Sequence, residues 1–220
     1  MIFRRANSMK ALADCRLYTF IDTAYLHGRM PEVVAQQLCD GGSDLIQLRV
    51  KKSSSKEIRR MAENILPITK RANVGLVIND YPDIAHDLGA ELCHLGQEDF
   101  FDAGHKRVDE FKTSSSKLRI GLSTHSPEQA KRAMEARADY IAIGPVFATG
   151  TKPTAKPVTV EYVRWAKANV TVPWFAIGGI NLDTVGEVLA AGAKRICVVS
   201  AILNAPDVVK ACGEFRKKLP

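Results

Sequence analysis

The sequence predicts an α/β fold, a single (β/α)8 TIM barrel, and three observations support this prediction. Short apolar segments of strand length alternate with amphipathic segments of helical period, about eight times along the chain. No linker or insertion interrupts the series, and 220 residues suffice for one compact barrel. An open doubly wound sheet, the competing fold, would carry the pattern G-x-G-x-x-G after a strand, and the sequence has none.

The eight expected strands are short apolar runs with glycine, proline or polar residues at their ends. In chain order they cover residues 17–22, 44–49, 75–80, 92–96, 118–124, 140–146, 173–179 and 195–202. The run at 44–49 alternates, and its continuation places Gln47, Arg49 and Lys51 on one face opposite an apolar face. If both faces of a parallel sheet are covered, this polar face must line a site that attracts anions.

The expected helices show apolar residues at helical spacing between start and stop signals. They cover residues 31–42, 55–73, 82–90, 103–112, 126–138, 160–169, 182–193 and 206–219, of which 103–112 is the weakest prediction. Pro31 and Pro127 suit first turns, and the pair Gly41-Gly42 ends the first helix. We expect the second helix to be kinked or split at Pro67, because proline removes a backbone hydrogen bond.

One domain, residues 16–220, accounts for this pattern, and residues 1–15 are expected to form a flexible, loosely attached extension. That extension is basic but has no apolar segment of the kind that a secretory signal needs. The five cysteines form no C-x-x-C pair, which predicts neither a zinc site nor a redox motif. A reducing, cytoplasmic setting is therefore expected, and no apolar run is long enough to span a bilayer.

The charge of the chain favours small anionic ligands. Its net charge is +7 at pH 7, but the basic residues are spread along the chain and aromatic residues make up only 7% of it. A surface that binds nucleic acid would instead show a basic stripe with interleaved aromatic residues. We therefore expect small-molecule partners, no nucleic acid and no membrane, and the sequence leaves a homo-oligomer open.

Polar residues gather where the expected strands end. In this fold the active site lies at the carboxyl ends of the strands, and nearly every strand here ends in polar or glycine residues. Singly, each is as well explained by a turn or a helix cap, but their concentration at one rim indicates a site. Arg49, Lys51 and Lys152 supply cations suited to a pyrophosphate, because arginine offers a fork of donors and lysine a point charge.

Two further groups complete the expected site. Asp80 and Asp99 follow adjacent strands, and two carboxylates with phosphate oxygens and waters suit Mg²⁺, although Asp80 also suits a helix cap. Gly178 and Gly179, with a helix expected near Asn181, offer backbone N–H groups to a phosphate, although such a pair also suits a tight turn. A metal-bound pyrophosphate and a separate monophosphate together predict two phosphorylated substrates.

The chain resembles the thiamine-phosphate synthase (thiamine-phosphate pyrophosphorylase) family in motifs that keep the family's order: "QLRVK", "IND", "HLGQED", "GLSTHS", "GPVFATGTKP", "AIGGI" and "VVSAI". The matching region runs from Leu17 to about Asp207. The resemblance implies the TIM barrel inferred above and a transferase (thiamine-phosphate diphosphorylase) of thiamine biosynthesis with Mg²⁺ as cofactor. Its reaction joins 4-amino-2-methyl-5-hydroxymethylpyrimidine pyrophosphate to thiazole phosphate and releases thiamine phosphate and pyrophosphate.

The resemblance also implies roles for individual residues. Those expected to bind the substrates are Gln47, Arg49, Lys51, Asn79, Ser123, Thr149, Thr151, Lys152, Gly179, Val199 and Ser200. Those expected to take part in catalysis are Arg49, Lys51, Ser123 and Lys152. The two carboxylates expected to bind Mg²⁺ are Asp80 and Asp99.

The implied mechanism is dissociative: pyrophosphate leaves the pyrimidine methylene, the aminopyrimidine delocalises the carbocation, and the thiazole nitrogen attacks. Cations neutralise the leaving charge, and no enzyme nucleophile is needed. Because water would trap the carbocation, we expect the loop 147–157 to act as a lid that is mobile without ligand. The chain departs from the family at "AGAKRI", where an acidic residue is more usual, and at "VTVEYV", where a glycine often follows the loop.

Two other functions stay open. A thiazole tautomerase of the same superfamily shares the barrel and uses a histidine, a part that His125 could take, but the intact T-x-T-K at residues 149–152 favours the synthase. A non-catalytic sensor of phosphate ligands could keep the phosphate contacts without needing two metal carboxylates. His94 lies in a strand and faces either the barrel or the helices, whereas Cys93 and Cys197 are expected to pack in the core.

Overall fold

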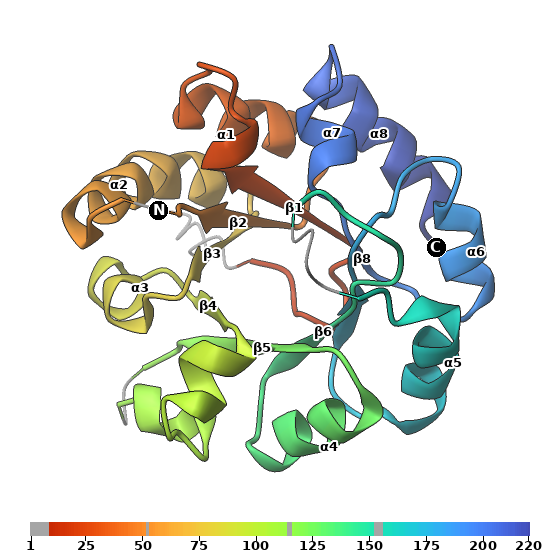
Figure 1. The fold of residues 1–220 in the computed structure, drawn as a ribbon. Helices are drawn as coiled ribbons and strands as arrows, with labels where there is room; N and C mark the ends of the chain where they lie inside the picture. The colour runs from red at the N-terminus through yellow and green to blue at the C-terminus, as the bar shows by residue number, and fades with distance from the viewer. Residues whose placement is uncertain (1–8, 52, 114–115, 152–155) are drawn as a thin grey trace, which may run out of the picture.

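The computed structural model describes residues 9–51, 53–113, 116–151 and 156–220, and all structural statements concern these ranges. Eight parallel strands pair in sequence order, and the last pairs with the first, so that the sheet closes into a barrel. Figure 1 looks along the barrel and shows the helices as an outer ring around the strands. The predicted (β/α)8 TIM barrel is confirmed.

The strands are short, and polar residues stand at or just beyond most of their carboxyl ends. Their bounds are β1 (Leu17–Asp22), β2 (Leu45–Arg49), β3 (Gly75–Asn79), β4 (Leu92–Leu95), β5 (Arg119–Thr124), β6 (Tyr140–Ile143), β7 (Trp174–Ala176) and β8 (Ile196–Cys197). In this register Tyr18 lies opposite Leu45, and Gly121 lies opposite Tyr140. All eight predicted strands are present.

The helices follow the strands in turn. Their bounds are α1 (Pro31–Asp40), α2 (Ser55–Arg71), α3 (Pro82–Leu88), α4 (Pro127–Glu135), α5 (Thr159–Asn169), α6 (Val185–Ala190), α7 (Ser200–Leu203) and α8 (Val208–Lys218). Proline begins α1, α3 and α4, where its missing N–H costs no hydrogen bond. Ser54 and Glu57 form a capping box at the start of α2. That helix continues through Pro67 as one element, so it is not split there.

Two segments differ from the predicted elements. A π-helix at Glu98–Asp102 and a 3-10 helix at Val108–Phe111 replace the helix predicted at 103–112, because Gly104 interrupts the segment with φ of 92°. The eighth strand stops at Cys197, and the end of the predicted strand forms α7 instead. The apolar run "VVSAI" suits a strand and a buried helix equally by pattern, so packing decides.

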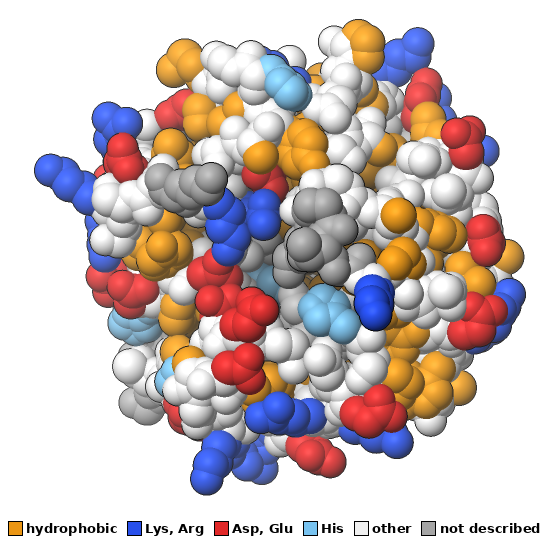
Figure 2. All heavy atoms as spheres, in the orientation of Figure 1, with side chains coloured by type: hydrophobic (Ala, Val, Ile, Leu, Met, Phe, Trp, Pro, Cys, Tyr) orange, Lys and Arg blue, Asp and Glu red, His pale blue; other side chains and the backbone are white. Residues whose placement is uncertain are grey.

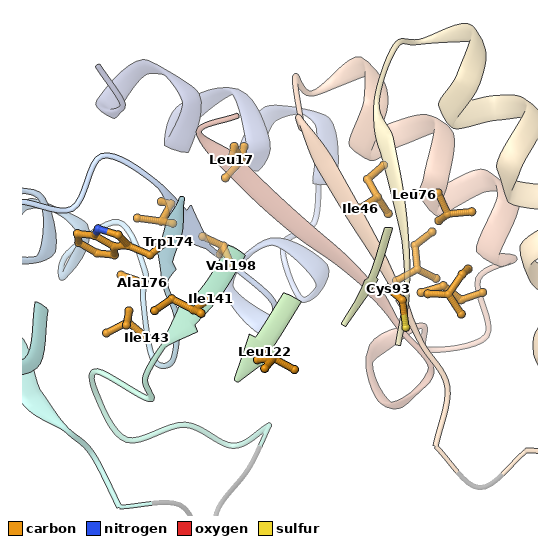
Figure 3. Close-up of a cluster of buried hydrophobic side chains, with 14 of the residues drawn as sticks. Leu17, Ile46, Leu76, Cys93, Leu122, Ile141, Ile143, Trp174, Ala176 and Val198 are labelled. Carbon is orange, nitrogen blue, oxygen red and sulfur yellow. The ribbon is translucent and has the colours of Figure 1, made fainter. Parts of the chain in front are cut away.

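Alternation along the strands divides the apolar side chains into two cores. One core lies between the strands and the helices, and Figure 3 shows some of its members, such as Leu17, Ile46 and Trp174. The other core fills the inside of the barrel and includes Tyr18 and Phe175. Successive residues of a strand face opposite sides, which is why one strand supplies both cores.

The residues before β1 pack more tightly than predicted. Leu12 and Cys15 are buried and join Leu45 and Leu92 in the core inside the barrel. The expectation of a flexible extension over 1–15 is therefore wrong for this stretch, and residues 1–8 lie outside the described part of the chain. Apolar contact with the barrel, which no local pattern reveals, explains the difference.

Asp44 joins several elements at the amino end of the barrel. Its carboxylate accepts hydrogen bonds from the backbone N–H groups of Arg16 (2.7 Å) and Leu17 (3.1 Å). It also pairs with Lys10 and Arg216, both at 2.5 Å. Burial by itself would raise the pKa of this carboxyl, but the four donors outweigh burial and hold the pKa below its ordinary value.

No helix among the described residues is long and apolar enough to cross a bilayer.

Candidate active site

A cavity of about 580 Å³ opens at the carboxyl end of the barrel. All predicted site residues within the described ranges line it: Gln47, Arg49, Lys51, Asn79, Asp80, Asp99, Ser123, Thr149, Thr151, Gly179, Val199 and Ser200. Lys152 lies outside the described residues. In Figure 2 basic and acidic side chains stand together at one edge of the central hollow, and a histidine lies at another edge.

The polar face of β2 points into this cavity, as the alternation predicts. Gln47 lies deepest and is 2% exposed, and Arg49 and Lys51 follow towards the mouth. Arg49 pairs through Nη1 with Oδ2 of Asp22 at 2.5 Å, and this carboxylate is buried at the end of β1. Asp22 was missed in the sequence, although it ends a strand as the predicted site residues do.

Lys51 and Asp80 form the second ion pair of the cavity, with Nζ 2.6 Å from Oδ2. Asp80 caps no helix: α3 begins after Tyr81, and Asp80 has a φ of 66°, with its N–H bonded to the carbonyl of His94. Burial raises the pKa of Asp80, Lys51 opposes this rise, and the like charge of Asp99 adds to it. The left-handed backbone and the raised pKa are features of a functional site rather than of a cap.

The donor set at this position fits a magnesium ion that takes other ligands from a substrate. Asp80 and Asp99 supply hard carboxylate oxygens, and the ammonium of Lys51 already lies against one of them as a cation would. Asp99 also accepts a hydrogen bond from the N–H of Gly96 at 3.2 Å, which orients its carboxylate. Three or more ligating side chains do not gather anywhere in the described ranges, so a magnesium ion held by these two carboxylates would need substrate oxygens and waters as its other ligands.

Ser123 stands on β5 at the opposite side of the cavity floor. His94 faces the barrel interior, not the helices, and its Nε2 lies 2.9 Å from the Ser123 hydroxyl. Gln97 donates from Nε2 to the backbone carbonyl of Ser123 at 2.6 Å. Gln97 belongs to the polar residues expected at the ends of the strands, but the sequence assigned it no role, because a glutamine just beyond a strand is indistinguishable from an ordinary turn residue.

The glycine corner of the cavity differs in detail from the prediction. Gly178 and Gly179 have φ of 101° and 64°, and a Cβ at Gly179 would come within 2.6 Å of the Ala148 carbonyl oxygen. The helix expected near Asn181 begins only at Val185. Asn181 Oδ1 instead accepts the N–H groups of residues 183 and 184, both at 2.9 Å, so these two are not available to a phosphate.

His125 lines the cavity near the mouth. Its Nδ1 contacts the carbonyl oxygen of Gly144, and its backbone N–H donates to Oε1 of Gln129 at 2.7 Å. Because a carbonyl can only accept, Nδ1 carries a hydrogen. The contact with Gly144 therefore orients the ring, and the bond to Gln129 fixes the backbone of His125.

Comparison with known proteins decides the family. The family model described as thiamine monophosphate synthase matches residues 17–202. The chain belongs to the thiamine monophosphate synthase family. It is a transferase of thiamine biosynthesis, and the predicted family, enzyme class and thiamine-phosphate synthase function are confirmed.

Similar proteins support this assignment over nearly the whole chain. Thiamine-phosphate synthase of Thermus thermophilus is 43% identical over 81% of this chain and 84% of its own length. That of Lawsonia intracellularis is 38% identical over 94% of this chain and 93% of its own. The solved structure of thiamine phosphate pyrophosphorylase from Pyrococcus furiosus superposes with a TM-score of 0.82 at 30% identity, covering 94% of this chain and 96% of the other.

Proposed function

We propose that the cavity binds 4-amino-2-methyl-5-hydroxymethylpyrimidine pyrophosphate and thiazole phosphate side by side and joins them into thiamine phosphate, releasing pyrophosphate. The observation that supports this best is the arrangement of charge on one wall. Arg49 and Lys51 stand beside Asp80 and Asp99. A pyrophosphate accompanied by a divalent cation matches both sets, because its oxygens bind the basic groups while the cation binds the acidic ones.

Arg49 and Lys51 stabilise the leaving pyrophosphate. The buried carboxylate of Asp22 holds the Arg49 side chain towards the cavity, so little conformational entropy is lost when phosphate oxygens bind it. Lys51 exchanges its contact with Asp80 for the pyrophosphate. Lys152, by resemblance to the family, adds a further cation there.

Asp80 and Asp99 are the residues that would hold Mg²⁺, and a bound Mg²⁺ would neutralise part of the charge on the departing group. Asp80 is freed for this when Lys51 turns to the substrate, so one movement prepares both groups. The pyrimidine ring lies over the floor of the cavity, within reach of Gln47, Asn79 and Ser123.

The thiazole phosphate occupies the other side of the cavity. Thr149 and Thr151 supply hydroxyl groups, and Gly179, Val199 and Ser200 supply backbone N–H groups. The Thr151 hydroxyl lies 3.1 Å from that of Tyr25, which ties this part of the 147–157 loop to the segment after β1. We propose that this loop, of which residues 152–155 lie outside the described part of the chain, acts as the lid that excludes the water that would trap the carbocation.

A coupling assay tests this function. Purified protein is incubated with both substrates and Mg²⁺, with and without chelator, and thiamine phosphate is followed by chromatography. We expect product that depends on the metal. Persistence of full activity in excess chelator would refute the metal assignment.

The Asp99→Asn variant separates the synthase from the two alternatives. Its synthase activity should collapse while thiazole phosphate still binds, because the substitution removes a carboxylate from the metal position only. Tautomerisation of a thiazole phosphate without consumption of the pyrimidine substrate would favour the tautomerase. Binding of thiazole phosphate with no turnover of either kind would favour the sensor.

A further inference from the structure

A chain of hydrogen bonds crosses the inside of the barrel directly beneath the cavity. Nε2 of Gln47 on β2 lies 2.6 Å from the Tyr18 hydroxyl on β1, and that hydroxyl lies 3.3 Å from the Tyr140 hydroxyl on β6. The Tyr140 hydroxyl lies 3.2 Å from Nδ1 of His94 on β4. Nε2 of His94 then reaches the Ser123 hydroxyl on β5 at 2.9 Å. Gln47 and Ser123, the two ends of this hydrogen-bond network, both line the cavity.

The central side chains of this hydrogen-bond network are buried in the core. Tyr18 and Tyr140 are 1% and 0% exposed, and His94 is 7% exposed. Gly121 makes the room: a Cβ there would come within 2.0 Å of the Tyr140 ring. Barrel interiors are usually filled by branched apolar residues, and polar groups are costly to bury unless they are hydrogen-bonded. A hydrogen-bond network of side chains inside the barrel therefore indicates a function besides packing.

One consistent set of hydrogen-bond directions starts at Gln47, with each group donating to the next. The amide nitrogen of Gln47 can only donate, so the Tyr18 oxygen accepts. Burial holds the pKa values of both phenols, Tyr18 and Tyr140, well above their ordinary range, so each keeps its hydrogen. Tyr18 has its own hydrogen to give to Tyr140. In the reverse direction the Tyr18 oxygen would accept two hydrogens and the Tyr18 hydrogen would need another acceptor, so we take the first direction as the basis of the proposal.

The same reasoning continues to the cavity. In this direction Tyr140 donates its hydrogen to Nδ1 of His94, and the His94 hydrogen then lies on Nε2. Nε2–H donates to the Ser123 oxygen. The hydroxyl hydrogen of Ser123 is then free to be donated into the cavity, where a substrate can accept it.

We propose that Tyr18, Tyr140 and His94 are positioning residues that make Ser123 a hydrogen-bond donor, so that the site selects substrates with an aromatic ring nitrogen at this point. The proposal rests on the proposed function in that the acceptor is a ring nitrogen of the pyrimidine substrate. A carbon in its place would leave the Ser123 hydrogen facing a C–H group. Selection of this kind, against a partner that lacks the acceptor, is stronger than selection by shape.

The tautomer of His94 provides a first test that needs no substrate. In ¹⁵N-labelled protein near pH 7, the ring nitrogens of His94, assigned by their loss in His94→Gln, should show hydrogen on Nε2. Tyr140→Phe should shift the population towards hydrogen on Nδ1, because it removes the donor to that nitrogen. Phe175→Leu is the matched control, since Phe175 packs edge-on against both tyrosines at 5.3 and 5.9 Å but joins no hydrogen bond of the chain. Hydrogen on Nδ1 in the unaltered protein would overturn the proposal.

Substrate analogues provide the second test. Two pyridine analogues of the pyrimidine pyrophosphate, each with one ring nitrogen replaced by C–H, are compared with the parent substrate by kcat/KM. The unaltered protein should have a kcat/KM about 10- to 100-fold lower for the analogue that lacks the nitrogen facing Ser123. Tyr140→Phe should reduce that discrimination to a few-fold with KM for thiazole phosphate unchanged, whereas Phe175→Leu should preserve it.

Equal discrimination by the Tyr140→Phe variant and the unaltered protein would overturn the proposal. Absence of any thiamine phosphate from the parent substrates would instead refute the proposed function. The tautomer measurement distinguishes these outcomes, because it reports the direction of the hydrogen bonds in the protein alone.

Discussion

Asp44 and Asp80 are the same residue type, each beside a lysine, at opposite ends of the barrel. Asp44 is fully buried, receives four donors, and its pKa is lowered. Asp80 keeps some exposure and pairs with Lys51, and its pKa is raised by burial and by Asp99. A buried carboxylate that receives enough hydrogen bonds and positive charge stabilises the fold. A carboxylate that receives too few can still bind a cation or another ligand. This division matches the roles of the two ends in the fold.

Asp80→Asn should give the largest effect on activity. We expect kcat/KM to fall by about 10²- to 10³-fold, because the substitution removes charge stabilisation from the leaving group. Asparagine tolerates the left-handed backbone at this position, so the unfolding free energy should change by only about 0.5 kcal/mol. Initial rates and urea unfolding measure the two quantities. A stability loss as large as that of Asp44→Asn would erase the contrast between the two ends.

Asp44→Asn should give the largest effect on stability. We expect the unfolding free energy to drop by about 3 kcal/mol, because two basic side chains and two backbone donors lose their common acceptor charge. The activity of the molecules that remain folded should be unchanged, since the cavity lies at the other end. Urea unfolding with a parallel rate measurement checks both. A loss of activity beyond the loss of folded protein would contradict the separation.

The lowered pKa of Asp44 predicts that the stabilisation by this residue depends on pH. The folded-state pKa of Asp44 lies below its ordinary value of 3.8, so the stabilisation is fully present above that pH. It is lost as the pH falls through the folded-state pKa. The difference in unfolding free energy between the unaltered protein and Asp44→Asn should therefore be constant near neutral pH and shrink in acid. A difference that grew in acid would show that the pKa is raised instead.

Asp22→Asn should affect activity less than Asp80→Asn does, and it should act on substrate binding. Asp22 is as buried as Asp44, but it supports Arg49 at the mouth of the site. We expect KM for the pyrimidine pyrophosphate to rise about tenfold, because Arg49 loses its fixed orientation. KM for thiazole phosphate should stay constant and serves as the internal control. Equal rises in both constants would indicate a general distortion of the barrel.

Thr159→Gly should change the unfolding free energy least, and it should raise this free energy rather than lower it. Thr159 has a φ of 63°, which is strained for a β-branched residue. We expect the unfolding free energy to rise by about 0.5–1 kcal/mol as this strain is relieved. Thr159→Ala is the matched control and should give no such gain. A loss of stability in the glycine variant would show that the threonine contacts outweigh the strain.

The sequence was informative wherever a local period carried the information. Alternation along β2 placed Gln47, Arg49 and Lys51 on the inner face, and the order of the motifs indicated the family before the barrel was described. Local patterns could not reveal partners distant in the chain. The pairing of Asp22 with Arg49, and the space that Gly121 leaves for Tyr140, depend on which strands become neighbours.

The amino-terminal segment and the end of β8 were mispredicted for a related reason. A basic stretch without a continuous apolar segment was expected to be loosely attached, yet Leu12 and Cys15 pack against apolar side chains inside the barrel. Likewise, the run after Cys197 has the composition of a strand, but it turns into α7 at the rim. Tertiary contacts override the local preference in both places.

The packing of Leu12 and Cys15 has a consequence for molecular traffic. These residues fill the amino end of the barrel, while the cavity opens at the carboxyl end. In the proposed reaction, both substrates enter and both products leave at the carboxyl end, because the amino end is closed by the described residues. Thiamine phosphate and pyrophosphate must then leave by the same route that the next pair of substrates takes to enter.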